Sequence, residues 1–294
     1  MDDKNLNFKI KYPVLFSIIS ILSYALSSVI MKILIYLTIF KNQNENKGII
    51  ITENQQLIFS MISIACCLTY VVLARCIHIY KMKSLKEMIK NIYIICLIYM
   101  VFLVFTIISF IYNKIPLKSG TEMLSGCLRI FGIALIEETL FRGICCRYLA
   151  LKYGNNKKRI ILSIFLNGVF FGSMHLLNLT NKIPLYAVIQ QSIAAAAIGF
   201  FLGAMYLKSG NLWETITIHF VIDVVGLFGV HFTNSKETFE MAVSEMGKIT
   251  MLGSLLRFAF ITFLAYVIYL RNNKIGKLID NIKLMRATEV KKTK

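Results

Sequence analysis

Several patterns that mark other classes of protein are missing from this sequence. The seven cysteines include no C-x-x-C pair, so the spacing of a zinc or thiol redox site is absent. We interpret them as small apolar residues: Cys66, Cys67, Cys76, Cys96, Cys127, Cys145 and Cys146. No low-complexity tract and no repeat of about 20 to 50 residues is present, which excludes solenoid architectures. No stretch is long and polar enough for a separate soluble domain.

Long apolar runs are what the sequence does contain. Of its 294 residues, 57% are apolar, and the mean hydropathy is +0.67, well above that of a soluble domain. Runs of about 18 to 25 apolar residues recur, each long enough to cross a hydrocarbon core of about 30 Å as a helix. The first run is too long for a signal peptide and lacks a small-x-small cleavage site, so we expect it to stay attached. The predicted fold class is an all-α, polytopic membrane protein.

We predict a bundle of about eight transmembrane helices with the active site inside it. The expected spans are Pro13 to Phe40, Leu57 to Ile77, Ile92 to Ile111, Cys127 to Tyr148, Ile160 to Leu179, Leu185 to Leu207, Leu212 to Val230 and Met251 to Leu270. The expected parts are residues 1–126 with helices one to three, a catalytic core at 127–230 with helices four to seven, and 231–294 with helix eight and a basic cytoplasmic tail. The loop from His231 to Thr250 has mixed charges and is expected to be solvated.

Positive charge is distributed unevenly between the loops. Of the 33 Lys and Arg residues, 22 fall in the segments on the side of the N-terminus and 7 in the segments on the other side. The positive-inside rule therefore places both termini in the cytoplasm of a multi-pass protein of the cell membrane. The net charge of +18 then belongs to a basic cytoplasmic face that contacts anionic lipid, and nucleic acid is not an expected partner.

The stretch "IEETLFRG" places Glu137, Glu138 and Arg142 inside the fourth span. Three ionised residues near a helix centre cost about 7 to 11 kcal/mol, whereas the Leu, Ile and Phe residues of that span return only about 3 to 5 kcal/mol. The helix must therefore turn these charges towards the bundle interior or a water-filled cavity. Glu138 and Arg142 are i and i+4 and share a face, while Glu137 points about 100° away. A packing salt bridge is the alternative interpretation.

Two further pairs of residues, each containing a histidine, have the same i, i+4 spacing. In "FFGSMH" the pair is Phe171 and His175, and in "HFVID" it is His219 and Asp223, where the carboxylate is placed to orient the imidazole. A lone histidine in an apolar helix is commonly a core residue whose hydrogen bonds are satisfied. Here, however, two Glu, one Arg, two His and one Asp lie on three helices, and this combination favours a reaction centre. One chemistry is a carboxylate that activates water beside an oxyanion site. The other is a zinc hydrolase, although neither H-E-x-x-H nor G-x-S-x-G occurs.

These motifs resemble those of the CPBP family, the CAAX proteases and bacteriocin-processing enzymes also called the Abi family. "EETLFRG" is similar to its E-E-x-x-x-R motif, "FGSMH" to F-x-x-x-H, and "HFVID" to H-x-x-x-[N/D], in the same order. The turn from Ser209 to Trp213 also resembles the family's link between the second and third motifs. The resemblance covers about Cys127 to Gly229 and implies an intramembrane glutamic endopeptidase that needs no metal and no cofactor.

The resemblance also assigns roles to residues. Glu137 would be the base, His175 would help to position the water, and Glu138 with Arg142 would hold the helix face. His219 and Asp223 would form the oxyanion site, but the CAAX-processing members have Asn where this chain has Asp223. An ionised Asp cannot donate a hydrogen bond to an oxyanion. Either burial keeps Asp223 protonated, or Asp223 orients His219 and the imidazole alone serves the oxyanion; we favour the second.

The substrate expected from the resemblance is a membrane-associated protein or peptide. Family members act in CAAX proteolysis, peptide maturation, bacteriocin self-immunity or regulation of membrane sensors, so a bacteriocin-system or sensor partner is a further expectation. The Lys-, Asn- and Ile-rich composition suggests a prokaryote with an AT-rich genome, which argues against prenylated CAAX substrates. The alternative from another class is a non-catalytic scaffold or immunity protein whose polar core serves packing.

Overall fold

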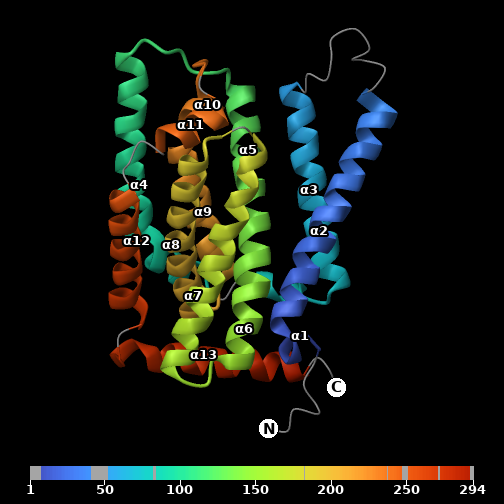
Figure 1. The fold of residues 1–294 in the computed structure, drawn as a ribbon, viewed down its shortest axis with the longest axis vertical. Helices are drawn as coiled ribbons and strands as arrows, with labels where there is room; N and C mark the ends of the chain where they lie inside the picture. Colours follow the sequence, from blue (N-terminus) through green and yellow to red (C-terminus); the bar gives the residue numbers. More distant parts are fainter. Residues whose placement is uncertain are drawn as a thin grey trace.

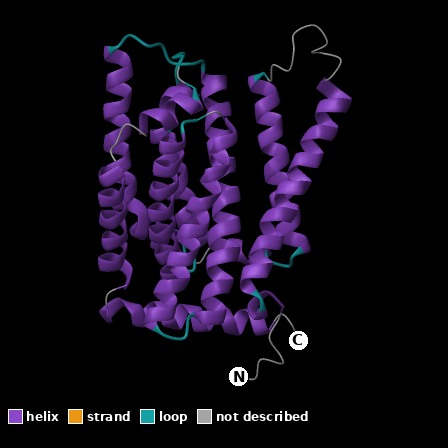
Figure 2. Ribbon diagram, in the orientation of Figure 1, coloured by secondary structure: helices purple, strands orange, loops and turns teal. Residues whose placement is uncertain are grey.

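A computed structural model describes residues 8–40, 52–81, 84–181, 183–236, 238–246, 251–270 and 272–291. In this part of the chain the helices are joined by short loops, with a single isolated bridge between Leu117 and Thr233 (Figure 2). The helices are α1 Phe8–Lys11, α2 Pro13–Ile35, η2 Tyr36–Phe40, α3 Glu53–Leu73, η4 Ile77–Tyr80, α4 Leu85–Tyr112, α5 Gly120–Glu138, η5 Thr139–Cys146, α6 Arg147–Tyr153, α7 Lys157–Met174, η6 His175–Asn181, α8 Leu185–Ser209, α9 Leu212–Gly226, α10 Phe228–Phe232, α11 Phe239–Met246, α12 Met251–Ala265, η7 Tyr266–Leu270 and α13 Asn272–Lys291.

The predicted all-α, polytopic membrane class is confirmed. Five helices in the described ranges are long and apolar enough to cross a membrane: Pro13–Ile39, Asn54–Leu73, Leu85–Tyr112, Lys157–Asn181 and Leu185–Ser209. The other three expected spans run alongside them in Figure 1 but fall short of that standard. The continuous helix of α5, η5 and α6 falls short because it contains charged residues. Helix α9 falls short because it has only 15 residues and is about 22 Å long. The count of eight spans stays a prediction.

Helices α2, α3 and α4 lie at the periphery of the bundle, and much of their surface is exposed. In Figure 1, α2 and α3 lie side by side and splay away from the remaining helices towards the end opposite α13, and α4 lies on the other flank. The apolar window of α4 has no buried residue, against half of the window in α8. Side chains such as Leu97, Phe105 and Ile111 on α4 are more than half exposed. In a membrane these faces contact lipid, so their apolar sequence needs no protein partner.

Helices α7 and α8 form the closest pair of the bundle, and glycines make this contact. A Cβ at Gly168 would lie 2.7 Å from the Ala196 carbonyl oxygen, and one at Gly172 would lie 2.4 Å from that of Ser192. From α8, Gly199 approaches the Cα of Gly168 in the same way. These small residues let the two backbones meet, as is typical of helices packed in lipid.

A tight turn sets the direction of α9. Gly210 ends α8 in the left-handed conformation (φ 65°), which a residue without a Cβ adopts at no steric cost. Asn211 then begins α9, because its side-chain oxygen accepts a hydrogen bond from the Trp213 N–H at 3.2 Å. This turn returns the chain into the bundle and brings the "HFVID" stretch back beside α5.

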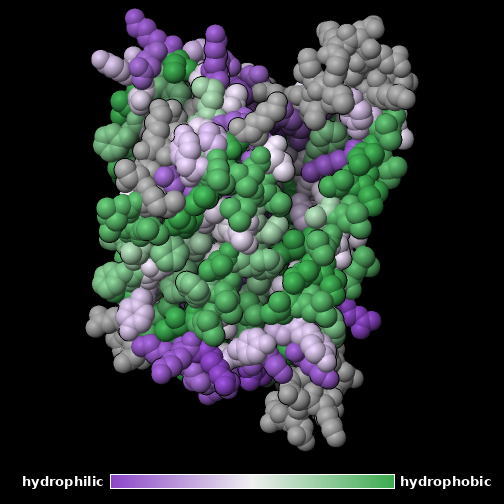
Figure 3. Space-filling model, viewed as in Figure 1, coloured by the Kyte–Doolittle hydropathy of each residue, from purple (hydrophilic) through white to green (hydrophobic). Residues whose placement is uncertain are grey.

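Two segments outside the expected spans contain packed helices. In the loop from His231 to Thr250, which was expected to be solvated, α11 buries Ala242 and Val243 against α8. The basic tail forms α13, which lies across the end of the bundle where α1 begins (Figure 1). In Figure 3, hydrophilic side chains gather at this end and a hydrophobic belt covers the surface above it. We call it the basic end. Neither helix was predicted, because charged residues interrupt the apolar residues of both and no membrane-span signal results.

The seven cysteines are all free thiols, buried or half-buried between helices. Cys67, Cys76, Cys145 and Cys146 are at most 2% exposed and belong to the apolar interior. The interpretation of the cysteines as small apolar residues agrees with this placement.

Candidate active site

Glu138 is the centre of the polar cluster. Its Oε1 lies 2.8 Å from Nη1 of Arg142 and 2.7 Å from Nδ1 of His219, and neither Glu138 nor Arg142 has any exposed side-chain area. The i, i+4 pair predicted from spacing is therefore present, and it includes a third member from α9. Because an ionised carboxylate only accepts hydrogen bonds, Nδ1 of His219 carries the proton in this contact. The ring is thereby oriented, and Nε2 is the nitrogen left for a ligand.

The helix changes character at this cluster. After Glu138 the α-helix α5 passes into the π-helix η5, whose eight residues are all buried. At the junction, the Thr139 hydroxyl donates to the Leu135 carbonyl oxygen at 2.6 Å and receives a contact of 2.7 Å from the Tyr80 hydroxyl. Hydroxyls bonded to backbone carbonyls disturb the helical ladder, and π-turns are frequent at functional sites. The Trp213 indole, which donates to the Tyr80 carbonyl oxygen at 2.8 Å, links this junction to α9.

Two carboxylates lie on the open side of the His219 ring. Oε2 of Glu137 is 3.6 Å from Nε2 and Oδ2 of Asp223 is 3.5 Å from it. Their side chains are 30% and 23% exposed, unlike the sealed Glu138. The expectation that Asp223 orients His219 is not what the geometry shows: Glu138 holds Nδ1, and Asp223 faces Nε2. Spacing along one helix suggested the neighbour one turn away, whereas the closer partner comes from α5.

His175 reaches the site from the end of α7. Its Nδ1 is 3.2 Å from the Phe171 carbonyl oxygen, and its ring packs edge-on against Phe171 at 5.1 Å. Phe171 also packs edge-on against His219 at 5.9 Å and lies under the Arg142 guanidinium at 4.3 Å. This single ring therefore separates and positions three of the polar groups, with a cation–π contact to the buried arginine.

All these groups converge at one cavity of about 430 Å³, lined by Glu137, His175, His219 and Asp223. Glu138 and Arg142 lie behind it. Sequence reasoning missed other residues of the wall: Asn178, Gln190 and Gln191, together with Phe239 from α11. The Asn178 amide donates to Oε1 of Gln191 at 2.9 Å. Two adjacent glutamines in an apolar span were a visible signal, but nothing in the sequence places Phe239 there.

The cavity lining is mostly apolar and also includes two carboxylates, two imidazoles and three amides. Such a site suits an extended peptide, whose backbone needs donors and acceptors while its side chains occupy apolar space. In the described ranges, no three His, Cys, Asp or Glu side chains are arranged to hold a metal ion.

Comparison with known proteins gives one match. Residues 119–225 match the family model described as type II CAAX prenyl endopeptidase Rce1-like, and this segment contains all six candidate site residues. No curated protein and no solved structure matches the chain. With the ordered motifs on α5, α7 and α9 around one cavity, this match places residues 119–225 of the chain in the CPBP family.

Proposed function

We propose that the protein is an intramembrane glutamic endopeptidase that hydrolyses a peptide bond in a membrane-associated protein or peptide. The observation that carries this proposal is the difference between two adjacent carboxylates. Glu138 is sealed between Arg142 and His219, whereas Glu137 is partly exposed at the cavity, where the nearest cation-forming group is Nε2 of His219 at 3.6 Å. Of these two adjacent carboxylates, only Glu137 has an oxygen available to water.

In the proposed reaction, Glu137 accepts a proton from a water molecule as the water oxygen attacks the carbonyl carbon of the substrate. His219, with a proton on each ring nitrogen, donates from Nε2 to the oxyanion that forms, while Glu138 and Arg142 hold the ring in place. His175, at the same cavity, helps to position the water. Collapse of the intermediate breaks the C–N bond, and Glu137 returns the proton to the leaving amine. Each proton is thus accounted for by residues of this chain.

We infer further that the protein lies in the cell membrane with its basic end in the cytoplasm. The supporting observations are the excess of Lys and Arg on that side and the position of α1 and α13 at the same end (Figure 1). An alkaline phosphatase fused after Lys294 should be inactive; an active fusion would overturn this orientation.

Glu137→Gln is the test of the reaction. The purified protein in lipid nanodiscs is incubated with a library of apolar peptides, and new termini are identified by mass spectrometry. Loss of a general base should lower turnover about 10²- to 10⁴-fold, with little change in melting temperature because the contact of Glu137 with Nε2 of His219 is long, at 3.6 Å, and partly exposed. Glu240→Gln, the same change on an exposed residue of α11, should cleave normally.

Three outcomes would reject the proposal. Normal turnover by Glu137→Gln removes the base from the mechanism, and a Glu137→Gln variant that retains the biological effect favours a scaffold or immunity protein. Activity that is lost to a chelator and restored by zinc favours the metallohydrolase. None of these results changes the fold.

A further inference from the structure

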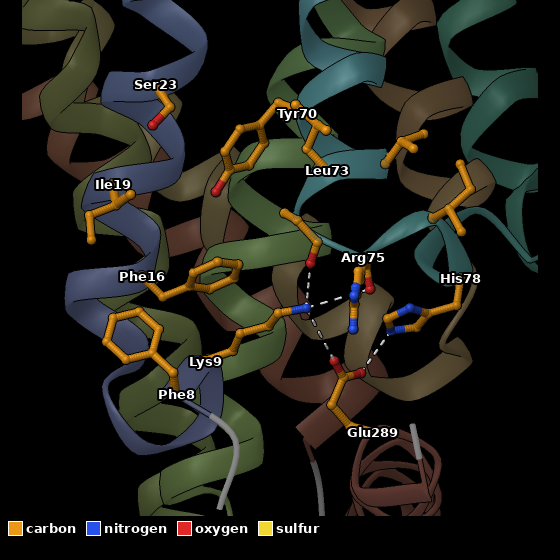
Figure 4. A pocket seen from close by; sticks show the side chains of 13 residues that line it. Phe8, Lys9, Phe16, Ile19, Ser23, Tyr70, Leu73, Arg75, His78 and Glu289 are labelled. Atoms are coloured by element: carbon orange, nitrogen blue, oxygen red, sulfur yellow. Dashed lines mark hydrogen bonds and ion pairs between the residues drawn. The ribbon is translucent and has the colours of Figure 1, made fainter. Parts of the chain in front are cut away.

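A second cavity lies at the basic end, lined by residues of α1, α2, α3, η4 and α13. Its volume is about 1220 Å³, larger than the roughly 300–1,000 Å³ of typical small-ligand pockets. Figure 4 shows Lys9, Arg75, His78 and Glu289 gathered close together, with Phe16 and Ile19 to their left and Leu73 above them. The cavity therefore has a charged floor and an apolar wall.

Glu289 is the one acidic residue among the described residues that line this cavity, and both of its oxygens already have partners in the protein. Oε1 of Glu289 receives the Tyr148 hydroxyl at 2.6 Å and lies 4.0 Å from Lys9, while Oε2 lies 2.7 Å from Nε2 of His78 and 3.5 Å from Arg147. One carboxylate thus serves two full cations and a histidine. Positive charge remains in excess on this floor.

Arg75 contributes most to that excess. It is exposed at the cavity, and within the described ranges its guanidinium makes no ion pair. The adjacent backbone is fixed, because the Lys9 ammonium contacts the carbonyl oxygens of Ala74 at 2.5 Å and Arg75 at 3.5 Å. A cation held at the edge of an apolar cavity is a site for an anionic group.

The backbone at Arg75 favours a different residue type. Arg75 ends α3 in the left-handed conformation (φ 53°), with its N–H donating to the Val72 carbonyl oxygen and that of Cys76 to the Val71 carbonyl oxygen. This pair of bonds is the Schellman motif, in which glycine is preferred because a Cβ is strained. An arginine here costs local stability, and strained residues of this kind gather at functional positions.

The wall of the cavity matches the hydrocarbon beside it. Leu73 is 77% exposed and Ile77 is 55% exposed, and both line the cavity. The cavity lies where the hydrophobic belt of Figure 3 meets the hydrophilic basic end. A molecule with an anionic head and an apolar chain meets both surfaces at this level, whereas a soluble anion meets only the floor.

We propose that this cavity binds one anionic phospholipid, with its phosphate at Arg75 and Lys9 and an acyl chain along Phe16, Ile19 and Leu73. The site is separate from the candidate active site and does not depend on the proposed peptidase activity. Charge complementarity identifies the head and the exposed apolar wall identifies the chain.

Arg75→Gly tests the proposal without a folding penalty. Glycine relieves the left-handed strain, so the melting temperature should be unchanged or higher. Delipidated protein in detergent is titrated with phosphatidylglycerol or phosphatidylcholine, and bound lipid is counted by native mass spectrometry. The variant should bind phosphatidylglycerol at least about fivefold more weakly, since one headgroup cation near a membrane is worth about 1 kcal/mol, and should bind phosphatidylcholine as before.

Lys86→Ala is the matched control, because it removes an exposed cation of the same end on α4, outside the cavity, and should bind both lipids normally. Unchanged phosphatidylglycerol binding by Arg75→Gly would overturn the proposal. So would a wild-type protein without preference between the two lipids. If sn-glycerol 3-phosphate raises the wild-type melting temperature as much as phosphatidylglycerol does, the site is one for a soluble anion and the lipid assignment is wrong.

Discussion

Two buried glutamates organise opposite parts of this molecule in similar ways. Glu138 joins Arg142 and His219 inside the bundle, and Glu289 joins Arg147, His78 and Tyr148 at the basic end. Each carboxylate is at most 2% exposed, and each connects helices that are distant in sequence. Judged by ligand types alone, the two clusters are equivalent.

They differ in what surrounds the histidine. Beside His219 stand two more carboxylates, Glu137 and Asp223, both partly exposed at a cavity. Around Glu289, both oxygens are engaged and no second carboxylate lies among the described lining residues of the neighbouring cavity. The cluster at Glu138 therefore includes carboxylate oxygens that face the cavity and can contact a substrate or water. The cluster at Glu289 is a structural contact that joins α13 to α1, η4 and α6. An unengaged carboxylate, rather than the buried ion pair, distinguishes a reaction centre from a structural contact.

Glu138→Ala should have the largest effect, because it breaks the bridge and leaves the arginine buried without its partner. Removing one member of a buried pair costs about 3–5 kcal/mol, so we expect a large fall in melting temperature as well as loss of cleavage. Glu137→Ala, the same change one residue earlier, should abolish cleavage and keep the wild-type melting temperature. Equal melting temperatures for the two variants would show that Glu138 is not the structural member of the pair.

Glu289→Gln should destabilise the protein and leave turnover unchanged. Burial by itself raises the pKa of Glu289, but hydrogen bonds from His78 and Tyr148 and the charges of His78 and Arg147 outweigh it and lower the pKa to about 2. Because this lies below the ordinary value of 4.5, the folded protein binds fewer protons than the unfolded chain between these pH values. The stabilisation is complete above pH 4.5 and is lost as the pH falls towards 2.

The difference in melting temperature between wild type and Glu289→Gln should therefore be largest at pH 7 and shrink by pH 3. Hydrogen bonds to a charged group are worth about 1.5–3 kcal/mol, which sets the size of the effect at neutral pH. Asp280→Asn, on the same helix but 76% exposed beside Lys283, should have no effect at any pH. A difference that stays constant from pH 7 to pH 3 would mean that the charge of Glu289 is not its cause.

The cluster around Glu138 could largely be predicted from the sequence, whereas the cluster around Glu289 could not. Glu138 and Arg142 are one helical turn apart, so their pairing follows from local geometry, and the cost of charge in lipid marks them as significant. The membrane class predicted from the hydropathy is confirmed, and so is the family predicted from the ordered motifs for residues 119–225. These features depend on residues close together in the chain.

What could not be predicted depends on distant contacts. Glu138 and His219 are 81 residues apart, and Tyr148 and Glu289 are 141 apart. No periodicity encodes such pairs. Glu289 stands in a basic helix of ordinary solvated composition, and only the folded bundle shows that its side chain is enclosed. The π-helix η5 likewise has no spacing signal, and the hydroxyl contact at its first residue, Thr139, comes from Tyr80, 59 residues away.

Asp223→Asn should give the smallest effect and tests how the open cluster divides its work. Since Glu138 already holds Nδ1 of His219, the ring stays oriented, and the amide keeps a polar group beside Nε2. We expect turnover within about tenfold of wild type, equivalent to about 1.4 kcal/mol, and a changed pH–rate profile because one of two charges at Nε2 is gone. Asp223→Ala, which removes the polar group as well, should be slower than Asp223→Asn. Full activity of Asp223→Asn with an unchanged pH profile would leave the carboxylate without a role, and inactivity equal to that of Glu137→Gln would make Asp223 a competing candidate for the base.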